Sequence, residues 1–342
     1  MSKKYQAVVF ITNAQPMSYA HITLIEKAIE VGEQVIVVIG SINQPRTFEN
    51  PFNYDERSFM FSHSVPDELM DSVRFVIAGV ENSLYNRQAW AIRVQEIVNN
   101  SVLSETNKIA LIKCEDSKLF PQWDELDFGN IHTMLTSDEI KQMFFDNTFT
   151  LDQLEDDRIP NVTRDFLRDF AIYRDETRQN IVNERIFIDN YKQQFSTLKH
   201  PPIFVTVDAV VVQSGHVLLI QRKANPGKNL WALPGGFFDV NKDETIEDGI
   251  IRELDEETGI KVPKPVLLGS IKLQKVFAAK NRSARGRTIT HAGLIMLPDG
   301  PLPKVKGSDD AKAAKWFALG DIKRENMFED HEEIIKNLLG VE

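Results

Sequence analysis

Apolar and polar positions follow two different patterns along the first part of the chain. Mostly apolar runs of strand length fall at residues 8–12, 34–39, 73–80 and 108–113. Between them, residues 21–31 and 88–99 repeat apolar side chains every three or four positions, which is typical of an amphipathic helix. Strands that alternate with helices predict a parallel, doubly wound sheet, on which ligands bind at the carboxyl ends of the strands.

The pattern changes over residues 161–199, where aromatic and aliphatic side chains recur among many charges. This spacing predicts amphipathic helices that join two domains. His200-Pro201-Pro202 ends the segment, because neither proline continues a helix. We therefore predict a first domain at residues 1–155, a helical linker at 156–200 and a second domain at 201–342.

The second domain mixes strand and helix patterns and contains a long acidic helix. The sequence predicts strands at residues 203–212 and 216–221 and the helix at 245–258. Thr245 suits the amino-terminal cap of this helix, and Gly259 suits the left-handed residue that ends it. Its buried stripe is predicted to consist of Ile246, Ile250, Ile251 and Leu254.

Three glutamates on this helix suggest a metal site. Glu253, Glu256 and Glu257 stand at positions i, i+3 and i+4, so their carboxylates are expected to converge on one side. Crowded carboxylates repel one another unless cations lie between them, and oxygen ligands suit Mg²⁺ or Mn²⁺, which also bridge phosphate oxygens. Taken alone, the spacing is more typical of a solvated acidic helix face.

Composition and charge narrow the classes of function. The chain has 342 residues and a formal net charge of −10, so no global basic field would attract nucleic acid or an anionic membrane. Cys114 is the only cysteine, which excludes an intrachain disulfide and a cysteine-based metal site. No apolar run reaches the roughly 18 residues of a membrane span, and a cytoplasmic location is expected by default.

The acidic helix also carries a family signature. Residues 252–260, RELDEETGI, match the R-E-U-x-E-E-x-G-U pattern of the Nudix hydrolases (U is a bulky apolar residue), and seven residues separate Glu244 from this run, as in the family. Seven residues, not the family's five, separate Gly236 from Glu244, which indicates a loop insertion at Asn241-Lys242. Gly249 replaces a better helix former at a cost of about 1 kcal/mol.

The resemblance to the ADP-ribose pyrophosphatase branch of that family extends through the second domain. The similar segments are residues 205–209, 221–223, 226–228, 231–236, 285–288, 309–312 and 328–331. The resemblance implies that Glu253, Glu256 and Glu257 bind Mg²⁺ or Mn²⁺ and that Arg252 orients them. It further implies substrate contacts from Arg222, Lys228, Arg285 and Arg287. The basic loop at residues 280–287 is equally compatible with a solvated surface loop.

The first domain resembles a nucleotidylyltransferase with parts missing. Residues 12–21, TNAQPMSYAH, are similar to the family loop G-R-F-Q-P-x-H-x-G-H. Gln15 and His21 match that loop, but Asn13 stands at the arginine position and Ser18 at the first histidine position. Both changes remove donors that would stabilise charge building on ATP phosphates.

A second phosphate-binding motif, S-S/A-T-x-x-R, is replaced by Thr136-Ser137-Asp138-Glu139-Ile140-Lys141, in which Asp138 would repel a triphosphate. Other parts of the family's nucleotide-binding surface are kept. The resemblance implies nucleotide contacts from Gln15, Ser18, His21, Gly40, Ser41, Arg46 and Asn50, with Tyr85 and Trp90 near the nicotinamide. An aromatic pair at that spacing is also compatible with core packing.

As a whole, the chain resembles the family of bifunctional nicotinamide mononucleotide (NMN) adenylyltransferase/ADP-ribose pyrophosphatases. We predict an α/β fold, with a Rossmann-like parallel-sheet nucleotidylyltransferase domain followed by an α+β Nudix domain. The leading hypothesis is a hydrolase of ADP-ribose whose first domain is weak or inactive in making NAD from NMN and ATP. Two alternatives are a fully bifunctional enzyme and a first domain that acts as a nucleotide-binding or dimerisation module, which would suit a homodimer.

Overall fold

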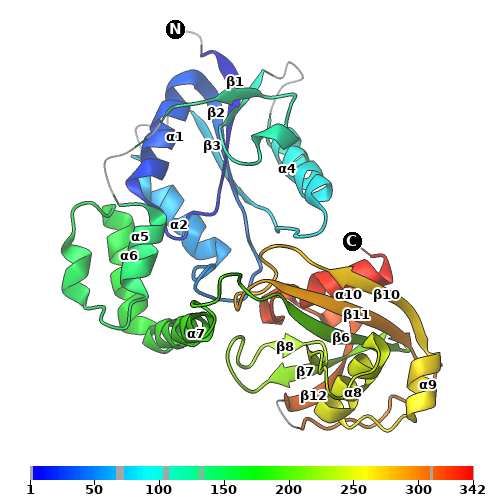
Figure 1. Cartoon of the computed structure of the whole chain (residues 1–342). Helices are drawn as coiled ribbons and strands as arrows, with labels where there is room; N and C mark the ends of the chain where they lie inside the picture. Colours follow the sequence, from blue (N-terminus) through cyan, green and yellow to red (C-terminus); the bar gives the residue numbers. More distant parts are fainter. Residues whose placement is uncertain are drawn as a thin grey trace. The chain divides into compact units, whose positions relative to one another are not determined.

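The computed structural model describes residues 3–66, 73–102, 108–129, 131, 135–308 and 311–341. These residues form two compact units that divide between Asn183 and Glu184 (Figure 1). None of the described helices is both long enough and apolar enough to cross a membrane.

The first unit contains a five-stranded parallel sheet in the order β3-β2-β1-β4-β5 (Figure 1). Its strands are β1 (Tyr5–Thr12), β2 (Gly32–Ile39), β3 (Arg74–Gly79), β4 (Ile109–Ile112) and β5 (Asp124–Leu126). The helices between them are α1 (Tyr19–Val31), α2 (Tyr54–Ser64) and α4 (Arg87–Ser101). The predicted Rossmann-like sheet is confirmed.

Both faces of this sheet are covered, which explains why its strands are apolar at nearly every position. Alternate residues of a strand point to opposite faces. Val8 of β1 and Val35 of β2 pack with α1 and α2 on one face, whereas Val9 and Ile36 pack with α4 on the other.

Three further helices complete the first unit: α5 (Ser137–Phe144), α6 (Asn161–Tyr173) and the first half of α7 (Asp175–Gln193). Short 3₁₀ turns lie at η1 (Ser117–Leu119) and η2 (Leu151–Glu155). A phenylalanine-rich core joins α5, α6 and α7 around Phe52, Phe144 and Phe170. The segment 156–200, which the sequence suggested as a linker, is therefore divided, because Ile181 and Val182 of α7 are buried in this core.

The second unit is built on a seven-stranded mixed sheet whose main path is β10-β11-β6-β7-β12, with β8 paired to β7 and β9 paired to β6. Its strands are β6 (Phe204–Gln213), β7 (His216–Arg222), β8 (Trp231–Ala232), β9 (Gly235–Phe237), β10 (Ile271–Phe277), β11 (Thr288–Met296) and β12 (Ala311–Ala318). Its helices are α8 (Ile246–Thr258), α9 (Lys264–Gly269) and α10 (His331–Leu339), with 3₁₀ turns η3 (Leu319–Asp321) and η4 (Arg324–Asn326). The predicted mixture of strands and helices in the second domain is confirmed.

Helix α8 lies against β6 and has the predicted ends. Its apolar stripe, with Ile250 and Leu254 fully buried, packs on Val207 and other inward residues of β6. The Thr245 hydroxyl accepts a hydrogen bond from the Asp248 amide at 3.1 Å, and Gly259 ends the helix in the left-handed conformation with φ of 50°. Both predicted caps are confirmed, and they fix where the glutamates of α8 stand.

Candidate functional sites

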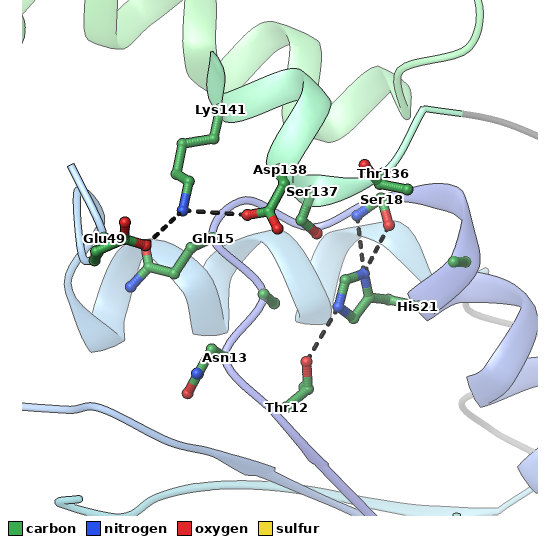
Figure 2. Close-up of a pocket in the computed structure, with 12 residues that line it drawn as sticks. Thr12, Asn13, Gln15, Ser18, His21, Glu49, Thr136, Ser137, Asp138 and Lys141 are labelled. Carbon is green, nitrogen blue, oxygen red and sulfur yellow. Dashed lines mark hydrogen bonds and ion pairs between the residues drawn. The ribbon is translucent and has the colours of Figure 1, made fainter. Parts of the chain in front are cut away.

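A pocket of about 430 Å³ opens at the carboxyl end of β1, the central strand at which the strand order reverses (Figure 2). It is lined by Thr12, Asn13, Ala14, Gln15, Ser18, Ala20, His21, Glu49, Thr136, Ser137, Asp138 and Lys141. The loop after β1 and the amino end of α5 thus come together where a doubly wound sheet is expected to bind its ligand.

His21 in this pocket is held in its neutral form. The backbone amide of Ser18 donates to Nδ1 of His21 at 3.1 Å, so Nδ1 carries no proton. The proton therefore resides on Nε2, which lies 3.1 Å from the Thr12 hydroxyl (Figure 2). Burial lowers the pKa of His21 to about 4. His21 therefore brings no positive charge to a ligand at neutral pH.

Lys141 is the cation among the described residues that line the pocket, and it is already paired. Its ammonium group lies 3.2 Å from Glu49 and 3.2 Å from Asp138, as Figure 2 shows. The lysine side chain is only 6% exposed, whereas both carboxylates are 76% exposed. Two negative charges thus surround one positive charge at the place where the resemblance would put a triphosphate.

Several donors at the amino end of α5 also have partners within the protein. The amide of Glu139 donates to the Thr136 hydroxyl at 3.2 Å, and the Glu139 carboxylate accepts from the Thr136 amide at 2.8 Å. The Ser137 hydroxyl donates to the carbonyl of Pro16 at 2.6 Å. The first turn of α5 therefore presents the acidic side chains of Asp138 and Glu139 to an anion, and the Glu139 amide and the Ser137 hydroxyl are already engaged.

Several predicted nucleotide contacts hold the loops around the pocket. The side-chain amide of Gln15 exchanges two hydrogen bonds of 3.0 Å with the backbone of Phe52. Ser41 donates to Asn13 at 3.3 Å, and a Cβ added at Gly40 would lie 2.6 Å from the Asn13 side chain. Gly40 and Ser41 therefore contact Asn13, which in turn lines the pocket.

Four other predicted contacts lie outside the pocket lining. Arg46 forms a two-pronged ion pair with Glu56 at 2.8 and 2.9 Å, and the amide of Asn50 donates to Thr47. Tyr85 is half-buried ahead of α4. Trp90 is 2% exposed and lies edge-on to Phe120, because α4 turns it into the core. Trp90 thus packs in the core, as the alternative interpretation allowed, and its contact with a nicotinamide stays a prediction.

Arg57 holds the backbone of the loops that line the pocket. Its fully buried guanidinium donates to the carbonyls of Asn13, Gly40 and Ser41 at 2.8, 2.7 and 3.1 Å. Burial lowers the pKa of Arg57 to about 10. This residue ties the carboxyl ends of β1 and β2 together, a role that sequence spacing could not indicate, because all of its partners are backbone atoms.

In the second unit, two of the three predicted glutamates meet at strand β9. The Gly235 amide donates to the carboxylate of Glu257 at 2.9 Å. A Cβ added at Gly236 would lie 2.6 Å from the Glu253 carboxylate, so only glycine allows that approach. The paired glycines of β9 therefore leave room for the acidic face of α8.

Glu256, the third glutamate, faces Arg252 instead. The Arg252 guanidinium donates to Glu256 at 2.9 Å, to Glu253 at 2.8 Å and to Asp243 at 2.7 and 2.8 Å. Among the described residues, no group of three or more His, Cys, Asp or Glu side chains is arranged to hold a metal ion. One nitrogen of the guanidinium therefore holds the carboxylates of both Glu253 and Glu256, and the role of all three glutamates as metal ligands stays a prediction.

The buried carboxylates beside β9 suit a divalent cation. Burial, with the charges of Glu253 and Asp208 nearby, raises the pKa of Glu257 to about 8 although Gly235 and Arg222 oppose that shift. Burial likewise raises the pKa of Asp208 to about 6. Buried oxygen ligands that repel one another fit Mg²⁺ or Mn²⁺ chemically.

The basic side chains that were predicted to contact the substrate differ in how firmly the protein holds them. The Arg222 guanidinium lies 4.0 Å from the centre of the Phe328 ring, and its Nε donates to the carbonyl of Pro226 at 2.8 Å. Arg287 donates to the carbonyl of Ala278 at 2.8 Å. Both arginines are thus anchored to their own fold.

Arg285 and Lys228 are placed differently. The Arg285 guanidinium lies 5.4 Å from the ring of Phe237, directly after the glycines of β9, and its Nε is buried without a hydrogen-bond partner in the described structure. Lys228 is exposed. Of the similar segments, residues 309 and 310 lie outside the described residues.

A buried polar group joins residues 280–287 to residues 328–331, two segments that the sequence analysis named only separately. Arg282 pairs with Asp330 at 2.9 and 3.0 Å, and both side chains are almost fully buried. The Leu233 amide donates to Nδ1 of His331 at 2.9 Å, and burial holds the pKa of His331 well below its usual value. These residues fix the segment after β8 to the start of α10.

Two family models match the chain in the order of the two units. The cytidylyltransferase-like model matches residues 9–116, and the NUDIX domain model matches residues 202–338. The chain is similar to a crystal structure of a bifunctional NMN adenylyltransferase/ADP ribose pyrophosphatase from Francisella tularensis, complexed with AMP and a manganese ion. The identity is 34% and the TM-score 0.88, over 98% of this chain and 99% of that one.

Two curated relatives each match one part of the chain. An ADP-ribose pyrophosphatase of Methanocaldococcus jannaschii is 37% identical over 140 residues, which is 41% of this chain and 74% of the relative. A nicotinamide/nicotinic acid mononucleotide adenylyltransferase of Acinetobacter baylyi is 27% identical over 173 residues, which is 49% of this chain and 87% of the relative.

Proposed function

The chain belongs to the family of bifunctional NMN adenylyltransferase/ADP-ribose pyrophosphatases, and on that premise we propose that its Nudix domain hydrolyses ADP-ribose to AMP and ribose 5-phosphate with Mg²⁺ or Mn²⁺. The observation that carries this proposal is the meeting of Glu253 and Glu257 at the glycines of β9. The names of the similar proteins, which include an ADP-ribose pyrophosphatase and a complex with AMP and manganese, support the substrate and the metal.

In this reaction a water oxygen bonds to one phosphorus of the diphosphate and the bridging P–O bond breaks. Glu253 and Glu257 would hold the divalent cation, which neutralises charge on the diphosphate and makes a bound water more acidic. Arg252 keeps Glu253 and Glu256 in place through its hydrogen bonds. Arg285, beside the exposed ring of Phe237, offers a positive charge for the ribose phosphate side of the substrate.

The test is the substitution Glu257→Gln, which keeps the shape of the side chain and removes its charge. ADP-ribose hydrolysis with Mg²⁺ should fall by at least about 100-fold, and circular dichroism should show an unchanged fold. Asp255→Asn, an exposed carboxylate on the same helix, is the matched control and should hydrolyse ADP-ribose like the parent. Equal hydrolysis by Glu257→Gln and the parent would remove the basis of this assignment.

For the first domain, we propose that NMN adenylyltransferase activity is weak or absent. Nucleotidyl transfer depends on positioning and on stabilising phosphate charge. Here His21 is neutral, and Lys141 is shared between Glu49 and Asp138. NAD formation from NMN and ATP, followed by chromatography, should therefore stay near background.

Two other functions of this domain are each favoured by one observation. A fully bifunctional enzyme is favoured by the similarity to the Francisella tularensis structure along nearly the whole chain. Rapid NAD formation by the parent protein would establish it. A nucleotide-binding or dimerisation module is favoured by the formed pocket, and nucleotide-dependent sedimentation without NAD synthesis would establish that role.

A further inference from the structure

The acidic partner of Arg252 in the loop before α8 is Asp243, the neighbour of the glutamate in the family pattern. The pattern places a glutamate at position 244, and Glu244 is exposed. Asp243 instead binds Arg252, with Oδ1 2.7 Å from Nε and Oδ2 2.8 Å from a terminal nitrogen. The Asp243 side chain is only 1% exposed, so this two-pronged ion pair is shielded from water.

The two-residue insertion explains how Asp243 reaches Arg252. The Asp243 amide donates to the carbonyl of Asp239 at 2.8 Å, and the Asp239 amide donates back to Oδ2 of Asp243 at 2.8 Å. Asn241 closes the same turn by donating its amide to the Asp239 side chain at 2.9 Å. The inserted residues thus build a compact turn that points the carboxylate of Asp243 at the guanidinium.

Gly249 provides the room for this carboxylate. A Cβ added at Gly249 would lie 3.0 Å from Oδ2 of Asp243 and 3.3 Å from the ring of Phe238. Both distances are shorter than ordinary carbon contacts, so a larger residue would push on the carboxylate. The glycine that weakens the helix is therefore the glycine that lets Asp243 bind Arg252.

The ion pair acts on the metal site through Arg252. Since two nitrogens of the guanidinium are fixed by Asp243, the third is directed at Glu253 and Glu256. We propose that Asp243, and not Glu244, is the positioning residue that aligns Arg252 and, through it, the Glu253 carboxylate for a divalent cation. This inference rests on the proposed function of the Nudix domain.

The first test compares Asp243→Asn with Glu244→Gln in the full-length protein. Binding of Mn²⁺ alone, without nucleotide, is measured by electron paramagnetic resonance of the free ion. Partners of metal ligands typically contribute about 10- to 100-fold in affinity or activity. Asp243→Asn should lose that much Mn²⁺ affinity and lower kcat for ADP-ribose more than it raises KM. Glu244→Gln should match the parent within about 2-fold.

The second test uses Gly249→Ala, for which a structural role and a positioning role predict opposite results. Alanine is the better helix former, so an effect on the helix alone would raise Tm and leave Mn²⁺ binding unchanged. Displacement of Asp243 would weaken Mn²⁺ binding, which is the result we expect. This variant also decides the matter if Asp243→Asn fails to fold.

The outcomes separate this inference from the proposed function. Equal Mn²⁺ affinity in the parent, Asp243→Asn and Gly249→Ala would overturn the role of Asp243, as would a loss in Glu244→Gln as large as that in Asp243→Asn. Absence of Mn²⁺ binding by the parent would also overturn it. A different result would affect only the proposed substrate: the parent binds Mn²⁺, Asp243→Asn and Gly249→Ala lose that binding, and the parent does not hydrolyse ADP-ribose. In that case the positioning role of Asp243 stands and the substrate is wrong.

Discussion

The backbone amide of Ser18 donates a hydrogen bond to Nδ1 of His21, three residues further along the chain. The amide cannot accept a proton in return, so the imidazole must stay neutral to keep this bond. Ser18 also caps α1 and stands where the family loop has its first histidine. One contact therefore both begins the helix and removes a positive charge from the pocket.

This contact predicts an acid-sensitive first unit. The folded-state pKa of His21 is about 4, below the ordinary value of 6.5, because of burial. Its contribution to stability is therefore complete above about pH 6.5 and is lost as the pH falls toward 4. After correction for the intrinsic pH dependence of amide exchange, the protection factors of amides in β1 and α1 of the full-length protein should fall over this window.

The matched variant for that prediction is His21→Asn, whose side-chain oxygen can still accept from the Ser18 amide. In this variant the free energy of opening, obtained from hydrogen exchange, should depend less on pH than in the parent. The difference between the two slopes should be up to about 1.4 kcal/mol per pH unit. An identical pH dependence in the parent and His21→Asn would show that another group is responsible.

A second prediction concerns the carboxylates around Lys141. Replacing Glu49 and Asp138 together by glutamine and asparagine should strengthen ATP binding, because it releases the lysine and removes two repulsive charges. Each unit charge about 4 Å away contributes about 1 kcal/mol in water, so a gain of about 5- to 30-fold is expected by calorimetry. Asp152→Asn, an exposed residue of η2, is the control. An unchanged affinity would mean that these charges do not limit ATP binding.

The elements of the fold could be predicted because their signals are local. The strands β1 and β2 are buried on both faces, so they appear as continuous apolar runs, and the caps of α8 depend on Thr245 and Gly259 within one helix. The division of residues 156–200 could not be predicted in this way. It depends on Ile181 and Val182 packing against residues of α5 that are distant in sequence.

The candidate sites show the same limit. Glycines 235 and 236 and the glutamates of α8 were found because they belong to a continuous motif. Asp243 was missed because the pattern points to its neighbour, and only the turn around Asp239 shows which carboxylate is buried. Glu49 was missed because its partner Lys141 is 92 residues away.

A third prediction concerns metal removal. Hydrolysis of ADP-ribose should stop in excess chelator and return when Mg²⁺ or Mn²⁺ is added. Because a cation that binds only the folded state stabilises it, Mn²⁺ should also raise Tm, and the increase should grow with Mn²⁺ concentration. The increase should be smaller in Glu257→Gln, which lacks one charge of the site. Hydrolysis that persists in excess chelator would contradict a metal-dependent reaction.

The last prediction restores the missing donors of the first domain. Asn13 and Ser18 both line the pocket, and they stand at the arginine and histidine positions of the family loop. Removing one donor to a developing negative charge typically costs about 10²- to 10³-fold in rate. We therefore expect Asn13→Arg with Ser18→His to raise NAD formation from NMN and ATP by at least about 100-fold.

The single variant Ser18→His should gain less, because the new side chain must replace the cap of α1 without the arginine's charge. Asn13→Gln is the matched control: like arginine, it must displace the contact between Asn13 and Ser41, but it adds no charge. A gain as large in Asn13→Gln would show that this contact, and not the missing cation, limits the reaction. No gain in the double variant would contradict the idea that these two missing donors limit the reaction.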